Sequence, residues 1–117
     1  MRQDILFHIT TREAFSEFKN SPNYEPESLE TEGFIHCSSG AQINETANRL
    51  FAGLSKILLL VIDVSTLRPD VKYELDEETG QKFPHIYGPL NKDSIMDKID
   101  IPAEDDGSFN ISFKSYS

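Results

Sequence analysis

One run of eight residues, from Ile57 to Val64, is apolar at every position except Asp63. The run does not alternate between apolar and polar residues, and a strand with this pattern is usually buried on both of its faces. We therefore predict a strand at 57–64 in the centre of a sheet, with the other strands and the helices arranged around it.

Shorter apolar segments predict the remaining elements. We expect strands at 5–9, 34–37 and 71–75 and a last strand around 98–101, with helices at 12–19 and 41–51 and a short helix from about residue 91. Thr10 is the expected N-cap of the first helix, and Ser38 or Ser39 is that of the second. Residues 24–32 carry a proline and several acids, which predicts an extended surface connection.

The segment 71–75 alternates between apolar and charged residues. A strand that alternates in this way usually has one buried face and one exposed face. We expect Val71, Tyr73 and Leu75 to point inward, and Lys72 and Glu74 to point outward.

A chain of 117 residues has the commonest size of a single domain. We predict one α+β domain over residues 1–102. The remaining segment, 103–117, begins with acidic residues and then alternates, and we predict a C-terminal tail or an edge strand there.

The charge balance is strongly acidic, with 20 Asp and Glu against 11 Lys and Arg and a net charge of −9. A surface of that sign repels phosphate backbones, which disfavours tight binding to nucleic acid.

Cys37 is the only cysteine, so no intramolecular disulfide can form and a reducing compartment is indicated. Without a signal-peptide pattern or an apolar run of about 18 residues, we expect a cytoplasmic protein with no membrane contact. A monomer or weak homodimer is expected.

The three histidines of the chain lie in similar apolar segments at predicted strand ends: His8, His36 within 33–39 and His85 within 83–89. A single histidine in an apolar strand is most often a hydrogen-bonded core residue. Three together indicate a site, because imidazole exchanges protons near neutral pH. Three histidines also suit zinc with an open fourth position, although none of their spacings is the i, i+4 pair of a helix.

Two further side chains lie near the second histidine. Strand alternation points Cys37 away from His36, so we expect the thiol in the core rather than as a nucleophile activated by that imidazole. Arg49 lies on the helix that follows the serines. It is a candidate for holding a phosphate, or an exposed arginine that pairs with Glu45 one turn away.

Four segments together resemble the small, mainly bacterial family called domain of unknown function 952: Phe7–Thr10, Glu32–Ser38, Asn48–Phe51 and Phe83–Leu90. The resemblance covers about residues 4–101. That family is similar in turn to the ADP-ribosyltransferase-like fold, and especially to the NAD-binding lobe of RNA 2′-phosphotransferases. The resemblance therefore implies a split mixed β-sheet with two or three short helices that clasps NAD.

The resemblance implies cofactor-binding roles for four residues. The order His8-Ile9-Thr10 is similar to the His-Gly-Thr at the end of the first strand of such enzymes, so His8 and Thr10 would orient the ribose of NAD. Ser38 and Arg49 would hold its pyrophosphate. The chain departs from the pattern at Ile9, which replaces glycine and would narrow the approach of the cofactor, and it has no separate RNA-binding lobe.

The implied catalytic residues are His36, His85 and Tyr87, with Tyr87 stacked on nicotinamide. Cleavage of the glycosidic bond passes through a cation-like state that needs a facing carboxylate or polar group. Glu74 comes too early in the chain to match the glutamate of the transferases. We therefore predict a His-lined pocket that binds NAD or a related nucleotide. The sequence does not decide whether the domain is also a transferase. The alternatives are a non-catalytic ligand-binding or protein-interaction domain, and a metal-assisted hydrolase that uses the three histidines.

Overall fold

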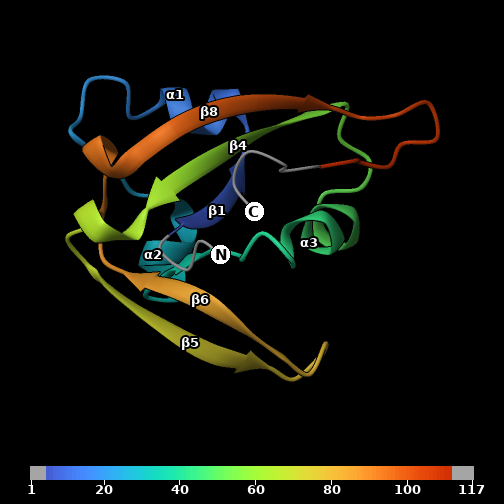
Figure 1. Ribbon diagram of the computed structural model, residues 1–117. Coiled ribbons are helices and arrows are strands. Elements are labelled where there is room, and N and C mark those ends of the chain that lie inside the picture. The colour runs from blue at the N-terminus through green and yellow to red at the C-terminus, as the bar shows by residue number, and fades with distance from the viewer. Residues whose placement is uncertain (1–4, 112–117) are drawn as a thin grey trace.

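The structure of the protein is a computed structural model that describes residues 5–111 (Figure 1). Its strands are β1 (Ile5–Thr10), β2 (Asn23–Tyr24), β3 (Ile35–His36), β4 (Lys56–Asp63), β5 (Asp70–Asp76), β6 (Gln81–Tyr87), β7 (Leu90–Asn91) and β8 (Ile95–Pro102). Its α-helices are α1 (Arg12–Ser16), α2 (Glu27–Thr31) and α3 (Ile43–Leu50), and two 3-10 turns are η1 (Val64–Thr66) and η2 (Lys92–Ser94). The fold is therefore α+β with short helices.

Strand β4 is the middle strand of a three-stranded sheet with the order β1-β4-β8. Both of its faces are covered, as the continuous apolar pattern predicts. Ile57, Leu59 and Val61 pack in one core cluster with the buried residues of α3. Leu58, Leu60 and Ile62 pack in a second cluster that includes residues of β3 and β6. The predicted central strand is confirmed.

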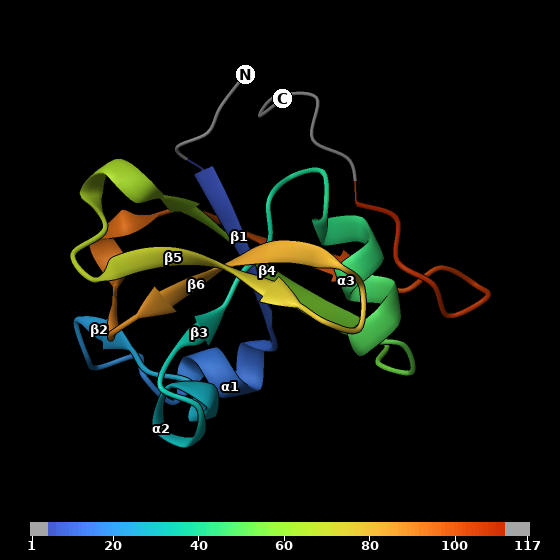
Figure 2. The same ribbon diagram turned by 90° about the horizontal axis from the view of Figure 1, so that it is seen from below.

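A second three-stranded sheet has the order β3-β6-β5. Figure 1 shows its β5–β6 hairpin below the first sheet, with α3 to one side, and Figure 2 shows the same hairpin crossing in front of β4. The two sheets meet where Phe7 of β1 and Ser38, just after β3, exchange backbone hydrogen bonds of 2.9 and 2.8 Å. This junction lies on β1, the edge strand of the first sheet, so the strands are split between two sheets, as expected.

The expected mixture of parallel and antiparallel strands is wrong. Every strand pairing among residues 5–111 is antiparallel. Parallel neighbours need a crossover that returns the chain to the start of the preceding strand. Here the long connections from β1 to β4 and from β4 to β8 pass through the second sheet and bring the chain back in the opposite direction.

Several helix boundaries differ from those predicted. Helix α1 ends at Ser16, and the side chain of Thr11, not Thr10, caps it by accepting from the backbone N–H of Ala14. Helix α3 begins only at Ile43, with Gln42 rather than a serine at the N-cap. The predicted short helix from residue 91 is the single 3-10 turn η2, and the last strand is longer than predicted.

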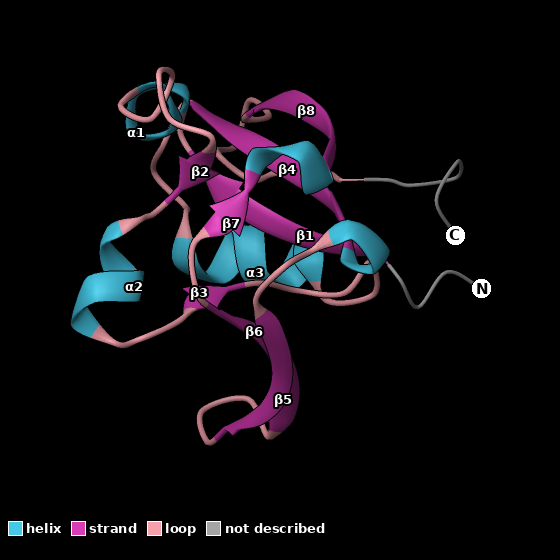
Figure 3. Ribbon diagram, turned by 90° about the vertical axis from the view of Figure 1, so that its left-hand side faces the viewer, coloured by secondary structure: helices cyan, strands magenta, loops and turns pink. Residues whose placement is uncertain are grey.

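The predicted extended connection at 24–32 is also wrong, because it contains helix α2. Pro26 occupies the N-cap with a φ of −66°, and Glu27 and Glu30 lie in the first turn. A proline at a helix start and acidic residues in the first turn both favour a helix. Figure 3 shows α2 at the periphery of the molecule beside β3. Residue 24 itself belongs to β2, which pairs with β7.

The predicted strand at 71–75 is confirmed as β5. Val71 packs against the second core cluster and Lys72 is exposed, as predicted, but the predicted orientation of Tyr73, Glu74 and Leu75 is wrong. Tyr73 and Leu75 are 55% and 60% exposed, whereas Glu74 is half-buried. The physical reason is that β5 is an edge strand in a hairpin that extends beyond the core, so the alternation along it does not identify the covered side (Figure 1).

The segment that follows β8 packs against α3 without forming a helix or strand in its described part, 103–111. Phe109 and Ile111 are buried in the same cluster as the core residues of α3. The backbone N–H of Phe109 donates to the side-chain oxygen of Asn48 at 2.7 Å, and that of Ile111 donates to the side-chain oxygen of Asn44 at 2.8 Å. Residues 112–117, which complete the predicted tail or edge strand, lie outside the described residues.

Candidate functional site

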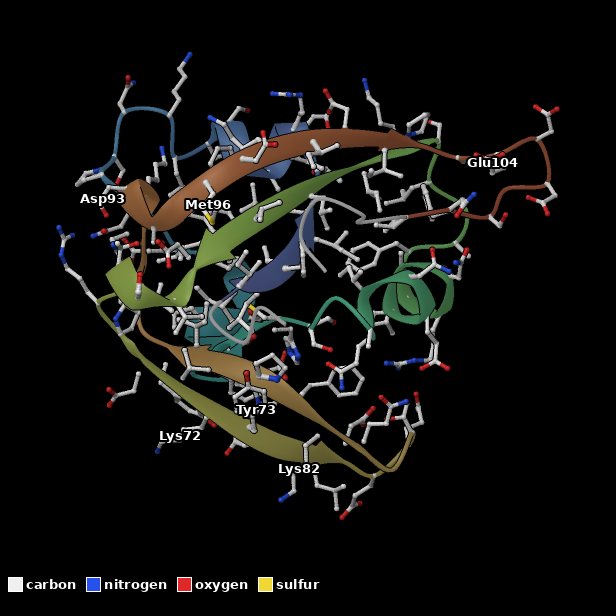
Figure 4. All side chains as sticks on the ribbon, viewed as in Figure 1. Lys72, Tyr73, Lys82, Asp93, Met96 and Glu104 are labelled. Atoms are coloured by element: carbon white, nitrogen blue, oxygen red, sulfur yellow. The ribbon has the colours of Figure 1, made fainter. Side chains whose placement is uncertain are left out.

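A pocket of about 430 Å3 lies between α3, strands β1 and β3, and the β5–β6 hairpin. Figure 4 shows side chains from these elements pointing into the space between them. Most of the wall is apolar and includes Phe7, Ile9, Ile43, Leu50, Phe51, Leu75 and Phe83. The polar part of the wall consists of His8, His36, Ser38, Thr46, Arg49, Asp76 and His85. The pocket therefore brings together five of the seven residues that the sequence predicts for the site.

The histidine of β1 is buried, and both of its ring nitrogens are engaged. Nδ1 of His8 lies 2.6 Å from the backbone carbonyl oxygen of His36, and Nε2 lies 3.0 Å from the hydroxyl of Tyr24. Because a carbonyl oxygen only accepts, Nδ1 carries the proton and Nε2 accepts from the tyrosine. Burial lowers the pKa of His8 to about 4. The neutral imidazole thus ties together three separate segments.

Thr10 belongs to the same buried network and does not line the pocket. Its hydroxyl oxygen lies 3.1 Å from that of Tyr24. The rings of Phe15 and Phe18 pack on Tyr24, with centroids 5.3 and 5.6 Å away, and burial raises the pKa of this tyrosine to about 12. Sequence reasoning missed Tyr24. Its one available signal was a large aromatic residue within an otherwise polar and acidic segment.

The histidine of β3 is the most exposed of the three. Its side chain is 52% exposed, and Nε2 of His36 lies 3.2 Å from both carboxylate oxygens of Glu32. His36 is the register partner of His85 on β6, and their rings are 5.3 Å apart and nearly perpendicular. The pairing of β3 with β6 therefore places two of the predicted catalytic histidines side by side.

The third histidine forms a pair with a carboxylate on the neighbouring strand. Nδ1 of His85 donates to Oε1 of Glu74 at 2.7 Å, and the hydroxyl of Tyr87 donates to the same oxygen. The hydrogen bonds from Tyr87 and then His85 lower the pKa of Glu74, and the bond to Glu74 raises the pKa of Tyr87. The ring of Phe34 stacks on His85 with a centroid distance of 4.0 Å and an interplanar angle of 13°. The amine of Lys72 lies 4.8 Å from the centroid of the Tyr87 ring.

Tyr87 does not itself line the pocket. Its role in the structure is to hold Glu74, which the sequence pattern placed on the outward face of its strand. The signal that could have found this carboxylate is the strand pairing, in which Glu74 lies opposite Phe83 and therefore diagonally opposite His85.

The arginine at the pocket wall pairs across to the β5–β6 hairpin. Arg49 lies 3.2 Å from Glu78 and 3.9 Å from Asp76, and its side chain is only partly exposed. No ion pair joins it to Glu45 in the described part of the chain, so the expected helical pair is wrong. The reason is that the hairpin turn brings two carboxylates to the face of α3 that points toward the pocket.

Ser38 and Cys37 lie on the floor of the pocket. The hydroxyl of Ser38 is buried and donates to that of Thr46 on α3 at 3.1 Å. Cys37 is buried in the core, and burial raises the pKa of its thiol. The predicted core position of this cysteine is confirmed, whereas the preceding residue, His36, is half-exposed.

The three histidines do not form a metal site. Both ring nitrogens of His8 have protein partners, and one nitrogen each of His36 and His85 is bonded to a carboxylate. Across residues 5–111, no group of three or more His, Cys, Asp or Glu side chains is arranged to hold a metal ion. The described residues therefore give no support to a hydrolase with three histidine ligands. In the same range, no helix is long and apolar enough to cross a membrane.

Comparison with solved structures gives close relatives of this fold. The crystal structure of protein CC0527 from Caulobacter crescentus superposes with a TM-score of 0.81 at 30% identity, covering 91% of this chain and 93% of that chain. The solution NMR structure of CC0527 gives a TM-score of 0.76 at 30% identity, covering 91% of each chain. Neither name states an activity or the ADP-ribosyltransferase-like fold, so that assignment stays a prediction.

The comparison with curated proteins finds no match. The family model described as "Protein of unknown function (DUF952)" matches residues 9–98, which is most of the chain and includes the pocket wall on β3, α3 and β6. The chain therefore belongs to the DUF952 family.

Proposed function

We propose that this protein binds a small organic molecule in the pocket between α3 and the β5–β6 hairpin. The observation that carries the proposal is the pocket itself, whose volume of about 430 Å3 and mostly apolar wall with a few polar groups suit a small molecule. Ligand sites usually have volumes of roughly 300–1,000 Å3 and this kind of lining. NAD or a related nucleotide is the first ligand class to test, because we propose an ADP-ribosyltransferase-like domain in the cytoplasm, where such nucleotides are present.

The distribution of groups in the pocket favours a ligand with one flat ring and little negative charge. Phe7, Phe51 and Phe83 offer aromatic surface for a base such as adenine or nicotinamide. Arg49 is the one lysine or arginine among the described residues that line the pocket, and two carboxylates already pair with it. A phosphate would have to compete with them. We therefore expect adenosine, nicotinamide or a mononucleotide to bind more tightly than NAD.

The test is a titration of the purified protein with NAD, AMP, adenosine and nicotinamide. Binding is measured by calorimetry and by the change in melting temperature. A ligand at 100 times its dissociation constant stabilises the folded state by about 2.7 kcal/mol, which raises the melting temperature of a domain of this size by several degrees. Thr46→Trp fills the pocket from α3 and is expected to abolish the shift. Thr46→Val, which keeps the size of the side chain, is expected to retain it.

A second variant pair tests the contribution of the arginine. Arg49→Ala is expected to weaken AMP more than adenosine. Arg68→Ala is the matched control, because Arg68 also pairs with a carboxylate, Asp93 at 3.2 Å, but does not line the pocket. Stabilisation that persists in Thr46→Trp would place the ligand outside the pocket. No stabilisation by any of the four compounds at millimolar concentration would end the nucleotide proposal.

A further inference from the structure

The two ring nitrogens of His85, at the pocket wall, differ in their hydrogen bonding. Nδ1 of His85 donates to the carboxylate of Glu74 at 2.7 Å. A neutral imidazole has a single N–H, so a proton fixed on Nδ1 leaves Nε2 with a lone pair. A carboxylate that holds Nδ1–H in this way selects the tautomer and stabilises the imidazolium that forms when Nε2 accepts a proton.

The free nitrogen is open to a reactant. Within residues 5–111, every buried side-chain nitrogen or oxygen has a hydrogen-bond partner. Nε2 of His85 has no such partner among these residues, so this atom contacts solvent. The side chain as a whole is only 14% exposed, and it forms part of the pocket wall. A molecule in the pocket can therefore reach Nε2, while most of the ring is shielded.

The ring is also fixed in place. Phe34 stacks on one face of His85 at 4.0 Å, and the ring of His36 lies nearly perpendicular to it at 5.3 Å. Tyr87 donates to the same oxygen of Glu74 that accepts from His85, which fixes the carboxylate in turn. His36 lacks this support, because it is half-exposed and its carboxylate partner Glu32 is itself on the surface. Of the two histidines that face each other across β3 and β6, His85 is the preorganised one.

We propose that His85 is a general base that activates water against a small ester in the pocket, with Glu74 as its positioning residue. Nε2 takes a proton from water as the water oxygen attacks the carbonyl carbon. The bond from that carbon to the leaving oxygen then breaks, and the imidazolium returns the proton to the leaving group. Ester and water give acid and alcohol, so the step needs no further reactant. The inference rests on the proposed function only in that the substrate occupies the same pocket.

The test is hydrolysis of p-nitrophenyl acetate by the full chain between pH 5 and pH 9, compared with buffer. General-base catalysis contributes about 100-fold or more, so His85→Gln is expected to lower kcat/KM by about that factor. The titratable and charged groups around His85 are Glu74, Tyr87, the ring of His36 and Lys72, which is opposite His85 in the register.

Glu74→Gln tests the positioning role. Without the carboxylate that holds Nδ1–H, the imidazole loses its fixed tautomer, so kcat is expected to fall while KM changes little. Glu74→Asp is expected to restore part of kcat. Glu13→Gln, on the exposed surface of α1, is the matched control and is expected to leave both kcat and KM unchanged.

Nitrogen-15 NMR of the wild-type protein gives a measurement that does not depend on a folded variant. The proposal requires the neutral His85 to carry its proton on Nδ1, and a proton on Nε2 would overturn it. Hydrolysis no faster than in buffer, or equal in wild type and His85→Gln, would overturn it as well. Failure of the nucleotide titration together with hydrolysis that depends on His85 would leave the base intact and remove only the nucleotide as ligand. Nucleotide binding without hydrolysis would leave the nucleotide as ligand and overturn only the general base.

Discussion

Nε2 of His8 accepts a buried hydrogen bond from the hydroxyl of Tyr24, across 3.0 Å, and this contact joins β1 to the segment that follows α1. The other ring nitrogen of His8 donates to the backbone of β3. One imidazole therefore connects the first sheet, the edge of the second sheet and the intervening segment. The geometry requires the neutral form of the ring, and the first two predictions follow from this requirement.

Stability should fall as the pH is lowered from about 6.5 toward 4. Burial lowers the pKa of His8 from 6.5 to about 4 in the folded state, so the unfolded chain binds a proton that the folded chain does not. The contribution is complete above pH 6.5 and decreases by about 3 kcal/mol as the pH reaches 4. Urea unfolding at pH 7, 5.5 and 4 measures it. His8→Gln serves as the reference for the titrating carboxylates, and an identical pH dependence in the two proteins would contradict the prediction.

Tyr24→Phe should destabilise the fold by about 1–3 kcal/mol. The change removes a hydroxyl that partners both His8 and Thr10 in a buried site and leaves their polar atoms unsatisfied. Tyr73→Phe is the matched control, since the exposed Tyr73 is expected to change stability by less than about 0.5 kcal/mol. Denaturant unfolding at pH 7 compares the two. Equal effects would mean that the Tyr24 hydroxyl is not held by the network.

Leu59→Ala and Leu75→Ala should differ strongly in their effect on stability. Leu59 is fully buried in the middle of β4, so its truncation is expected to cost about 2–5 kcal/mol. Leu75 is mostly exposed at the hairpin, and its truncation is expected to cost less than about 0.5 kcal/mol. Denaturant unfolding gives the free energy of unfolding of each variant, and these two values are compared. A large loss in Leu75→Ala would mean that this face of β5 is covered in solution.

Cys37 should resist alkylation in the folded protein. The thiol is buried, and burial raises its pKa, so little thiolate is available to react. Incubation with iodoacetamide at pH 8, followed by intact mass measurement, is expected to show slow modification in buffer and rapid modification in concentrated urea. Rapid modification of the native protein would show that the pocket floor opens readily.

Patterns that depend on one strand alone were predictable from the sequence. The continuous apolar run identified the central strand, and strand alternation placed His36 and Cys37 on opposite sides. The exposure of Tyr73 was not predictable, because an alternating edge strand does not reveal which of its faces the rest of the chain covers. Helix α2 was hidden by its acidic composition, which also suits a surface loop.

The sequence predicted the histidines of the site but not their hydrogen-bond partners. The histidines were visible as residues of unusual chemistry in apolar segments. Their partners were not, because they depend on strand register: Glu74 meets His85 only through the pairing of β5 with β6. Tyr24 reaches His8 through the packing of a two-residue strand whose pairing with β7 no local pattern signals.

The side-chain amides of Asn44 and Asn48 hold the backbone of Phe109 and Ile111 against α3. One face of α3 contributes to the pocket wall while another is braced by the end of the chain, so the binding surface and the C-terminal segment share one helix. Shortening the protein before residue 108 would therefore alter the part of the pocket wall that α3 forms, although α3 ends more than 50 positions earlier in the chain. The end of the described chain is a structural support of the pocket.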